Sequence, residues 1–394
     1  MKRTILLLVP ATSPAVGGGE SLALALITEL ANSHTLCVVS PRPLDVRLAD
    51  HVLRHDGKVV IADAKIQRGV SQAPWEAGLF GLPHQLHDLL EATHYDLVWA
   101  LSHESAIAAA IALADNPTIP LVTTYSEIAT EYFPFGRARA AFAYSLQRVD
   151  LHVTLSETYQ DVALAHGAIP ERVMLNPLGF SVSGMREGNP DKGRARLGAS
   201  VRQNVVFCPS RLSERKGQLV LLDAWEHVGR TGELLVLAGA GHSAETSYGE
   251  KVEARILAWK GSAGVKLIAE GVPRVEMPDC LAASSVLVQP SFYEGLGYSA
   301  LEGMAAGIPC VLTDVDGFRT FMQDGSNCVG CEPKDEVTLG AALRRALDDA
   351  RLRQAVIVGG LATSAGFSIE LNSRRVLERV NVIPARKRSE QMSD

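Results

Sequence analysis

The fold and the site of this chain are decided by the stretch Gln289-Pro-Ser-Phe-Tyr-Glu294-Gly-Leu-Gly-Tyr-Ser-Ala-Leu-Glu302-Gly-Met-Ala-Ala-Gly-Ile-Pro309. An apolar run ends at Gln289, a loop with glycines follows, and a helical pattern begins near Gly297. Gly295 and Gly297 let the backbone approach a ligand closely. The start of the helix then directs free N–H groups and about half a positive charge at that ligand. The stretch therefore predicts a phosphate site.

Two glutamates, eight positions apart, lie in this loop and helix. Glu294 precedes the predicted helix and Glu302 lies on its second turn. Eight residues at about 100° each leave the two side chains about 80° apart around a helix axis. Carboxylates next to a phosphate would repel it, so we expect this pair to accept hydrogen bonds from hydroxyls, which a sugar and a ribose both offer. The alternative is that both are solvated charges on a helix surface.

Short aliphatic and β-branched runs alternate with helical patterns along most of the chain, which is typical of parallel sheets covered by helices on both faces. A polar segment rich in helix breakers, 181–190, interrupts this alternation. The sequence therefore predicts an α/β fold with two doubly wound, Rossmann-like domains, and ligands beyond the carboxyl ends of the strands. The expected strands are Ile5–Val9, Thr35–Val39, Lys58–Ile61, Leu97–Leu101, Pro120–Thr124, His152–Leu155, Val205–Phe207, Glu233–Ala238, Val265–Ala269, Val286–Gln289 and Cys310–Thr313.

These patterns predict four parts of the chain. Residues 1–182 form an N-terminal Rossmann-like domain, 183–200 an interdomain linker and 201–368 a C-terminal Rossmann-like domain. The last part, 369–394, is expected to contain a helix that packs back on the N-terminal domain, followed by a charged, disordered tail.

The composition is that of an ordinary globular protein. Of 394 residues, 47% are hydrophobic and 21% are charged, which excludes a disordered chain, a collagen-like fibre and a disulfide scaffold. Six cysteines are too few for a disulfide framework, so we expect a reducing compartment. Met1–Val9 resembles the start of a signal peptide, but Pro10 interrupts its apolar stretch. We therefore expect a buried first strand and a cytoplasmic protein.

The charge distribution bears on the ligand. The net charge of −6 does not favour a nucleic-acid partner. Residues 1–184 hold 12 Lys+Arg and 18 Asp+Glu, whereas residues 185–394 hold 26 of each. An anionic ligand is therefore expected on the second half of the chain.

The deciding stretch resembles the retaining GT-B glycosyltransferases of family 4, whose E-x7-E motif occurs in the same strand–loop–helix setting and reads roughly E-G-x-G-x-x-x-x-E-x-M-A-x-G-x-P. The resemblance implies that Glu294 holds hydroxyls of the donor sugar and Glu302 holds the ribose of a nucleotide. It also implies that amides around Leu296, Gly297 and Tyr298 face the diphosphate. The matching residues are Glu294, Gly295, Gly297, Glu302, Met304, Ala305, Gly307 and Pro309.

A second match lies upstream, where Cys208–Gly217 follows a strand and resembles the family's G-R-L-x-x-x-K-G. The resemblance implies that Arg211 and Lys216 bind the diphosphate, Arg211 in a bidentate way and Lys216 as a point charge. The alternative, a loop cation in water, fits Arg215 better. Preorganised cations of this kind would stabilise the charge that develops on the leaving group.

Weaker matches extend the resemblance over most of the chain. Gly239 and Gly241 match the family's V-G-x-G turn, and Gly18 and Gly19 lie in a match to its G-G-x-E loop, which reaches towards donor phosphate and acceptor. Asp314-Val-Asp316 spells the D-x-D of metal-dependent glycosyltransferases, but it coincides with a loop that binds no metal in this family. Cys328-Val-Gly-Cys331 is a lone C-x-x-C, expected as two packed thiols rather than a zinc site.

The chain departs from the family near the acceptor. Many relatives carry a histidine after the fifth strand, where this chain has Tyr125-Ser126-Glu127. His103 ends a neighbouring strand and is expected on a loop that faces the cleft, the alternative being a surface histidine. The family's P-E becomes Arg319-Thr320. The segment 137–148 is expected as a mildly basic amphipathic helix, which in related enzymes touches membranes.

The resemblance implies a GT-B glycosyltransferase with a cleft between its two domains, the first binding the acceptor and the second a nucleoside-diphosphate sugar, UDP being the commonest donor nucleotide in the family. It implies a retaining, metal-independent hexosyltransferase without a cofactor. The excess of acidic residues in 1–184 favours a neutral or cationic soluble acceptor over an anionic membrane, so we expect no stable membrane association. The expected acceptor is a small soluble natural product such as an aminocyclitol, and a catalytic set is expected from Glu294, Arg211, Lys216 and His103.

Several alternatives stay open from the sequence. A nucleotide-sugar epimerase shares this architecture, and a lipid-linked molecule or a polysaccharide could replace the small acceptor. A glycoside hydrolase also uses two carboxyl groups, but it needs no diphosphate clamp. A sugar-binding protein without catalysis is a further alternative.

Overall fold

The computed structural model describes residues 2–9, 18–41, 43–62, 74–125, 136–239 and 246–383. These residues form two compact units. Unit 1 contains the described residues up to Leu178, apart from Gly18, together with those from Ile369 onwards. Unit 2 contains Gly179–Ser368 together with Gly18.

Unit 1 is built on a seven-stranded parallel sheet with the order β3-β2-β1-β4-β5-β6-β7. All six strands expected in this part of the sequence are present, and the short edge strand β7 adds to them. The strands are β1 (Thr4–Leu8), β2 (Thr35–Ser40), β3 (Lys58–Ile61), β4 (Leu97–Ala100), β5 (Leu121–Tyr125), β6 (Leu151–Thr154) and β7 (Val173–Leu175). The helices are α1 (Gly18–Ser33), α2 (Val46–Arg54), α3 (Pro74–Ala92), α4 (His103–Ala112), α5 (Gly136–Arg148), α6 (Glu157–Ala165), η3 (Pro170–Arg172) and α15 (Ile369–Asn381).

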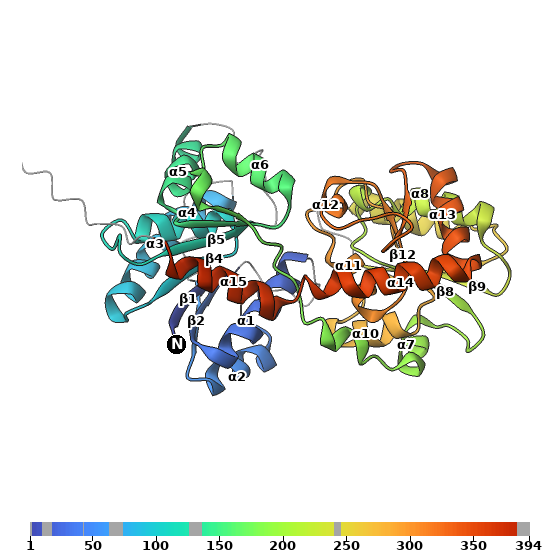
Figure 1. Ribbon diagram of the computed structural model, residues 1–394, viewed down its shortest axis with the longest axis horizontal. Helices are drawn as coiled ribbons and strands as arrows, with labels where there is room; N and C mark the ends of the chain where they lie inside the picture. The colour runs from blue at the N-terminus through green and yellow to red at the C-terminus, as the bar shows by residue number, and fades with distance from the viewer. Residues whose placement is uncertain are drawn as a thin grey trace, which may run out of the picture. The chain divides into compact units, whose positions relative to one another are not determined.

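The C-terminal helix α15 is part of unit 1 (Figure 1). Its carbonyl at Asn372 accepts a hydrogen bond of 3.0 Å from Nδ2 of Asn176, and Arg379 donates one of 2.9 Å to the carbonyl of Glu171. Val376 and Val380 are buried on the same helix. A segment from the end of the chain therefore completes the domain that the first half begins.

Unit 2 is built on a six-stranded parallel sheet with the order β10-β9-β8-β11-β12-β13, which is the strand order of a Rossmann fold counted from β8. The strands are β8 (Asn204–Pro209), β9 (Glu233–Ala238), β10 (Gly264–Ile268), β11 (Val286–Gln289), β12 (Cys310–Thr313) and β13 (Val329–Cys331). The helices are η4 (Ser183–Arg186), α7 (Pro190–Leu197), η5 (Glu214–Lys216), α8 (Gln218–Val228), α9 (Thr246–Leu257), η6 (Arg274–Glu276), α10 (Met277–Ala282), α11 (Tyr298–Ala306), α12 (Asp316–Arg319), α13 (Glu336–Asp348) and α14 (Ala350–Ala365).

Helices cover both faces of the second sheet (Figure 1). On one face α8 and α13 bury Trp225 and Leu343 in a single apolar core with the strands. On the other face Gly303 of α11 lies against Leu287 of β11, and α14 packs on α11 where Gly360 meets Met304. Burial on both faces is the reason why these strands are continuous apolar runs.

The segment 183–200 differs from the expected interdomain linker, because it belongs to unit 2 and contains η4 and α7. The residues that predict a linker act instead as helix ends. Asn189 caps α7 through its side chain, Pro190 is its first residue, and Gly198 ends it in the left-handed conformation at φ 70°. Gly193 lies directly against the carbonyl of Asp279, so α7 packs on α10.

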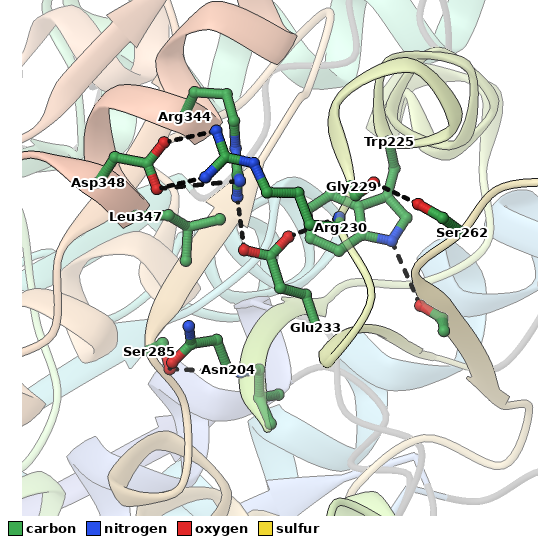
Figure 2. Close-up of polar contacts among 12 residues, drawn as sticks. Asn204, Trp225, Gly229, Arg230, Glu233, Ser262, Ser285, Arg344, Leu347 and Asp348 are labelled. Atoms are coloured by element: carbon green, nitrogen blue, oxygen red, sulfur yellow. Dashed lines mark hydrogen bonds and ion pairs between the residues drawn. The ribbon is translucent and has the colours of Figure 1, made fainter. Parts of the chain in front are cut away.

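The amino ends of the strands in unit 2 are closed by a polar network (Figure 2). Glu233, the first residue of β9, accepts hydrogen bonds of 2.9 Å from Arg344 of α13 and from the backbone N–H of Arg230. Arg230 in turn pairs with Asp348 at 3.0 Å, and Nε1 of Trp225 donates to the carbonyl of Gly264 at 3.2 Å. These contacts tie the starts of β9 and β10 to α13 and α8 at the amino ends of the strands.

Candidate functional site

The candidate site lies at the point where the strand order of unit 2 reverses. β8 and β11 are neighbours in the sheet, with β9 on the far side of β8 and β12 on the far side of β11. Arg211 and Lys216 follow β8, and Glu294 follows β11. Parallel strands bring these carboxyl ends to one edge, which is where doubly wound sheets bind ligands.

Lys216 and Glu294 form an ion pair between Nζ and Oε1. Lys216 is the last residue of η5, and its side chain is 13% exposed, whereas that of Glu294 is 7% exposed. Oγ of the buried Ser291 donates a second hydrogen bond, of 2.6 Å, to the same Oε1. The carboxylate is therefore held from two sides, by a cation and by a hydroxyl.

The two loops that carry this pair are fastened to each other through their backbones. Gly217 has a φ of 68°, and a Cβ there would lie 2.1 Å from the carbonyl oxygen of Pro290, so that only glycine fits. The N–H of Phe292 donates to the carbonyl of Arg215 at 2.7 Å. Oγ1 of Thr313 donates to the carbonyl of Ser291 at 2.5 Å, which adds the end of β12. The site is thus positioned by contacts to the main chain that join three strand ends.

Arg211 supplies a second positive charge at this edge. Its carbonyl accepts a hydrogen bond of 2.7 Å from Nε2 of Gln218, which fixes the turn that carries it. Gly239, at the end of β9, packs against the backbone of this turn, where a Cβ would be 1.9 Å from the carbonyl oxygen of Ser210. Within the described ranges the Arg211 guanidinium makes no ion pair, and the side chain is partly exposed, so its charge is available to an anion. Gly241 lies outside the described residues.

The start of α11 is the third feature of the site. Gly297 caps this helix in the left-handed conformation, at φ 87°, and no side chain of the described residues caps its first amides. A Cβ on Gly297 would lie 2.2 Å from Cε1 of the buried Phe318. Leu296 and Tyr298 are buried on either side, and Gly295 precedes them. The amides at 296–298 that the sequence assigns to a phosphate therefore lie at a helix start without a side-chain cap.

Glu302 lies one turn further along α11 and faces a different cation. Its side chain is 2% exposed, and Nη1 of Arg274 lies 2.5 Å from its Oε1. Burial raises the pKa of Glu302, and the positive charge of Arg274 opposes this rise. The structure thus brings Lys216 and Glu294 together, but it places Glu302 in a separate pair.

The D-x-D carboxylates are engaged by an arginine. Arg319 lies 2.7 Å from Asp314 and 3.0 Å from Asp316. In the parts of the chain that the structure describes, no three His, Cys, Asp or Glu side chains gather as metal ligands. Cys328 and Cys331 are buried free thiols, and burial raises the pKa of each to about 12.

His103 differs from its expected place. It is the first residue of α4 rather than part of a loop, since the side chain of Ser102 caps the helix just before it. The ring is 7% exposed and contacts Phe142 edge-on, with 5.2 Å between ring centroids. The expected loop is therefore a helix start, and a buried ring does not fit the alternative of a surface histidine. Gly18 and Gly19 begin α1, and residues 126–127 lie outside the described residues.

Helix α5 uses its apolar side inside unit 1. Phe142 and Leu146 are buried, and Arg148 is buried in an ion pair of 3.0 Å with Asp150. These side chains are therefore not part of a basic face for a membrane. In the described ranges, no helix combines the length and the apolar character needed to span a bilayer.

Two residues of the site have no counterpart in the sequence interpretation. Ser291 precedes the first glutamate by three positions, and its place at the end of a strand was the available signal. Arg274 lies 28 positions before Glu302 on η6, after another strand, and no spacing rule connects the two residues.

Comparison with known families covers both units. Residues 190–360 match the family described as Glycosyl transferases group 1, and residues 16–183 match Glycosyltransferase Family 4. Two relatives are the D-inositol 3-phosphate glycosyltransferase of Acidothermus cellulolyticus and the D-inositol 3-phosphate glycosyltransferase 1 of Catenulispora acidiphila, each 30% identical. The matches cover 54% of this chain and 48% and 52% of those proteins, so the chain spans about half the length of these curated relatives.

Solved structures share the fold over almost the whole chain. HepE of Anabaena in complex with UDP and glucose has a TM-score of 0.79 at 21% identity, covering 96% of this chain and 99% of that one. Sucrose-phosphate synthase from Thermosynechococcus elongatus has a TM-score of 0.78 at 17% identity, with coverage of 96% and 99%. The expected GT-B architecture of two parallel-sheet α/β domains is thereby confirmed.

Proposed function

We propose that this chain, which is built from a Family 4 glycosyltransferase domain and a group 1 glycosyl transferase domain, moves a sugar from a nucleoside-diphosphate donor to a hydroxyl of an acceptor with retention of configuration. The observation that carries the proposal is the Lys216–Glu294 ion pair at the strand-order reversal, beside the uncapped start of α11. The proposed donor nucleotide is UDP, because HepE of Anabaena was solved with UDP and with UDP-glucose.

Each group of the site has a part in holding the donor. Lys216, Arg211 and the first amides of α11 would bind the diphosphate, since all three present positive charge at one edge. Glu294 would accept hydrogen bonds from the sugar, and Glu302 would accept them from the ribose. This assignment gives cations to phosphate and carboxylates to hydroxyls, so no like charges meet.

The chemical step follows from the same groups. The bond between the anomeric carbon and the phosphate oxygen breaks, leaving positive charge on the sugar and negative charge on the diphosphate. Lys216, Arg211 and the helix start would stabilise the leaving group because they are fixed before the reaction. The acceptor oxygen attacks from the same face, and its proton passes to a phosphate oxygen.

Glu294 is not the nucleophile in this scheme. Its Oε1 is bound by Lys216 and by the Ser291 hydroxyl, both of which reduce the nucleophilicity of a carboxylate oxygen. A carboxylate so held is suited to orient sugar hydroxyls. Retention then follows from attack on the face of the departing diphosphate.

The proposed acceptor is a small soluble cyclitol or aminocyclitol, bound by unit 1. The relatives named D-inositol 3-phosphate glycosyltransferase act, by their names, on a phosphorylated cyclitol. The acidic balance of residues 1–184 favours a cyclitol without the phosphate, neutral or bearing an amino group, over the anionic acceptor in the names of these relatives.

The test is incubation with radiolabelled UDP-glucose and related UDP-sugars, alone and with myo-inositol, inositol phosphate and aminocyclitols. We expect UDP release that depends on the acceptor, and a product whose anomeric configuration by NMR equals that of the donor. Glu294→Ala serves as the inactive control. Conversion of the donor to an isomeric UDP-sugar without acceptor would contradict transfer and indicate an epimerase, and an inverted product would contradict retention.

A further inference from the structure

We propose that Arg274 is a positioning residue for Glu302, which it holds as an oriented carboxylate so that the site can bind the ribose of the donor nucleotide. This inference rests on the proposed function, because it concerns the nucleotide end of the same site. Arg274 itself would not touch the reacting atoms.

The geometry joins two elements that are distant in sequence. Arg274 is the first residue of η6, after β10, whereas Glu302 lies on α11, after β11. Nη1 of Arg274 lies 2.5 Å from Oε1 of Glu302, and the Glu302 side chain is almost fully buried. The ion pair with Arg274 engages Oε1. In this proposal the other carboxylate oxygen, Oε2, accepts the hydrogen bond from the ribose hydroxyl.

The segment that carries Arg274 is fastened on both sides by a second arginine, Arg196. Nε of Arg196, on α7, lies 3.0 Å from Glu276, and its Nη1 lies 3.1 Å from Glu270. Nη2 of Arg196 also donates to the carbonyl of Gly271 at 2.9 Å. The two acidic residues that flank Arg274 are therefore engaged by Arg196, and Arg274 is left to pair with Glu302.

The other titratable groups around α11 do not replace Arg274. Tyr298, one turn before Glu302, is buried, and its pKa is raised by burial and by the Glu302 charge. Arg186 of η4 donates to the carbonyl of Ala305 at 3.2 Å, and the Cys310 thiol of β12 donates to the carbonyl of Ala300 at 3.5 Å. Both bind the backbone of α11 rather than the carboxyl group. On the side of α14, the contacts with α11 include the uncharged pairs Gly360–Met304 and Leu361–Gly307.

The charge of the Glu302 carboxyl group therefore depends on Arg274. Burial favours the neutral form of the Glu302 carboxyl, and Arg274 is the cation that favours the ionised form. Without Arg274 the carboxyl would take up a proton at a higher pH. A neutral carboxyl accepts a weaker hydrogen bond from a ribose hydroxyl than a carboxylate does.

The experiment is calorimetric titration of the full chain with UDP between about pH 6 and about pH 9. At each pH the Kd of Arg274→Met or Arg274→Lys is divided by the Kd of the wild type. Because UDP titrates equally in both measurements, its own titration cancels in this ratio. For Arg274→Met we expect a ratio of about ten or more near neutral pH that falls as the pH rises and Glu302 ionises again. Arg274→Lys should restore most of the affinity because it restores the positive charge.

Three controls separate positioning from a merely structural effect. Arg186→Met removes another arginine that contacts α11, and we expect a ratio near one without pH dependence. With 2′-deoxy-UDP, which lacks a ribose hydroxyl, the effect of Arg274→Met should shrink. In a Glu302→Gln background, Arg274→Met should add little.

The outcomes are distinct. A ratio of one at every pH, or a raised ratio that is equal for UDP and 2′-deoxy-UDP and does not change with pH, would overturn the role of Arg274 while the proposed function stands. Failure of the wild type to bind UDP would overturn the proposed donor and this inference together.

Discussion

Lys216 and Glu294 are 78 positions apart in the sequence, and their side chains form an ion pair that shares Oε1 of Glu294 with the hydroxyl of Ser291. One partner follows β8 and the other follows β11, so the pair bridges the two strands between which the order of the sheet reverses. A cation suited to a phosphate and a carboxylate suited to a sugar thus hold each other in place.

Replacement of the cation tests its part in transfer. We expect Lys216→Met to lower kcat/KM by about 100-fold or more, because one preorganised charge on the leaving group is lost. Steady-state release of UDP measures this. Arg215→Met is the matched control, since it removes the adjacent cation while the backbone carbonyl that binds Phe292 remains, and it should leave kcat/KM within about twofold. Equal losses in the two variants would contradict a specific role for Lys216.

The same pair predicts a separation of stability from activity. Lys216→Met leaves a buried carboxylate with a hydroxyl but no cation, and we expect unit 2 to lose about 3 kcal/mol of unfolding free energy. Adding Glu294→Gln removes the unpaired charge, so the double variant should regain most of the stability and remain inactive. Urea unfolding followed by hydrogen exchange of β8 and β11 measures both effects. A double variant less stable than Lys216→Met would count against the pairing.

Two glycines of nearly equal φ test the close packing at the start of α11. Gly297 and Gly232 have φ values of 87° and 90°. A Cβ on Gly297 would lie 2.2 Å from Phe318, whereas a Cβ on Gly232 would have no atom of the described residues within 4 Å. Gly232→Ala should cost only the left-handed backbone term, about 1 kcal/mol. Gly297→Ala should cost more and also weaken UDP binding, because the first amides of the helix must shift. Thermal unfolding with and without UDP would show whether the two variants differ in this way.

The pH dependence of unit 1 is expected to follow His152. Burial, aided by the charge of Arg172, lowers its pKa to about 4, although the Leu146 carbonyl and Asp150 oppose this. Between its usual pKa of about 6.5 and about 4, the unfolded chain binds a proton that the folded chain excludes, so stability falls as the pH falls, by about 3 kcal/mol in all. Hydrogen exchange of the β6 amides across this range measures the loss. His152→Gln should flatten the profile, and an unchanged slope would contradict the assignment.

Much of this fold could be predicted because the apolar runs were long enough to show a pattern. The expected strand at Glu233–Ala238 coincides with β9, since all six residues are buried. The edge strands β7 (Val173–Leu175) and β13 (Val329–Cys331) escaped prediction because three residues are too few to show a pattern. The α7 helix was hidden by Asn189, Pro190 and Gly198, whose composition suits a linker and a pair of helix caps equally well.

The residues of the site likewise separate into those that the sequence predicts and those that it does not. Glu294 and Lys216 lie in contiguous motifs, so their chemistry could be inferred from residue type and from the strand ends that precede them. Arg274 could not, because its partner is 28 positions away and the contact depends on how η6 is clamped by Arg196. His103 was misplaced because the cap at Ser102 starts a helix where a loop was expected.

Removal of metal ions should leave activity intact. Asp314 and Asp316 are both paired with Arg319, so the D-x-D segment is expected to have no role in binding a metal for the reaction. We expect full transfer in EDTA, and Asp314→Asn should retain normal kcat/KM. Loss of activity in EDTA that added magnesium restores would contradict this expectation.

The most direct test of the central claim is a crystal structure of the protein with UDP. We expect the diphosphate within about 3 Å of Lys216, Arg211 and the first amides of α11, and the ribose hydroxyls on Glu302. UDP bound at the amino ends of the strands of unit 2, or on unit 1, would contradict the proposed site.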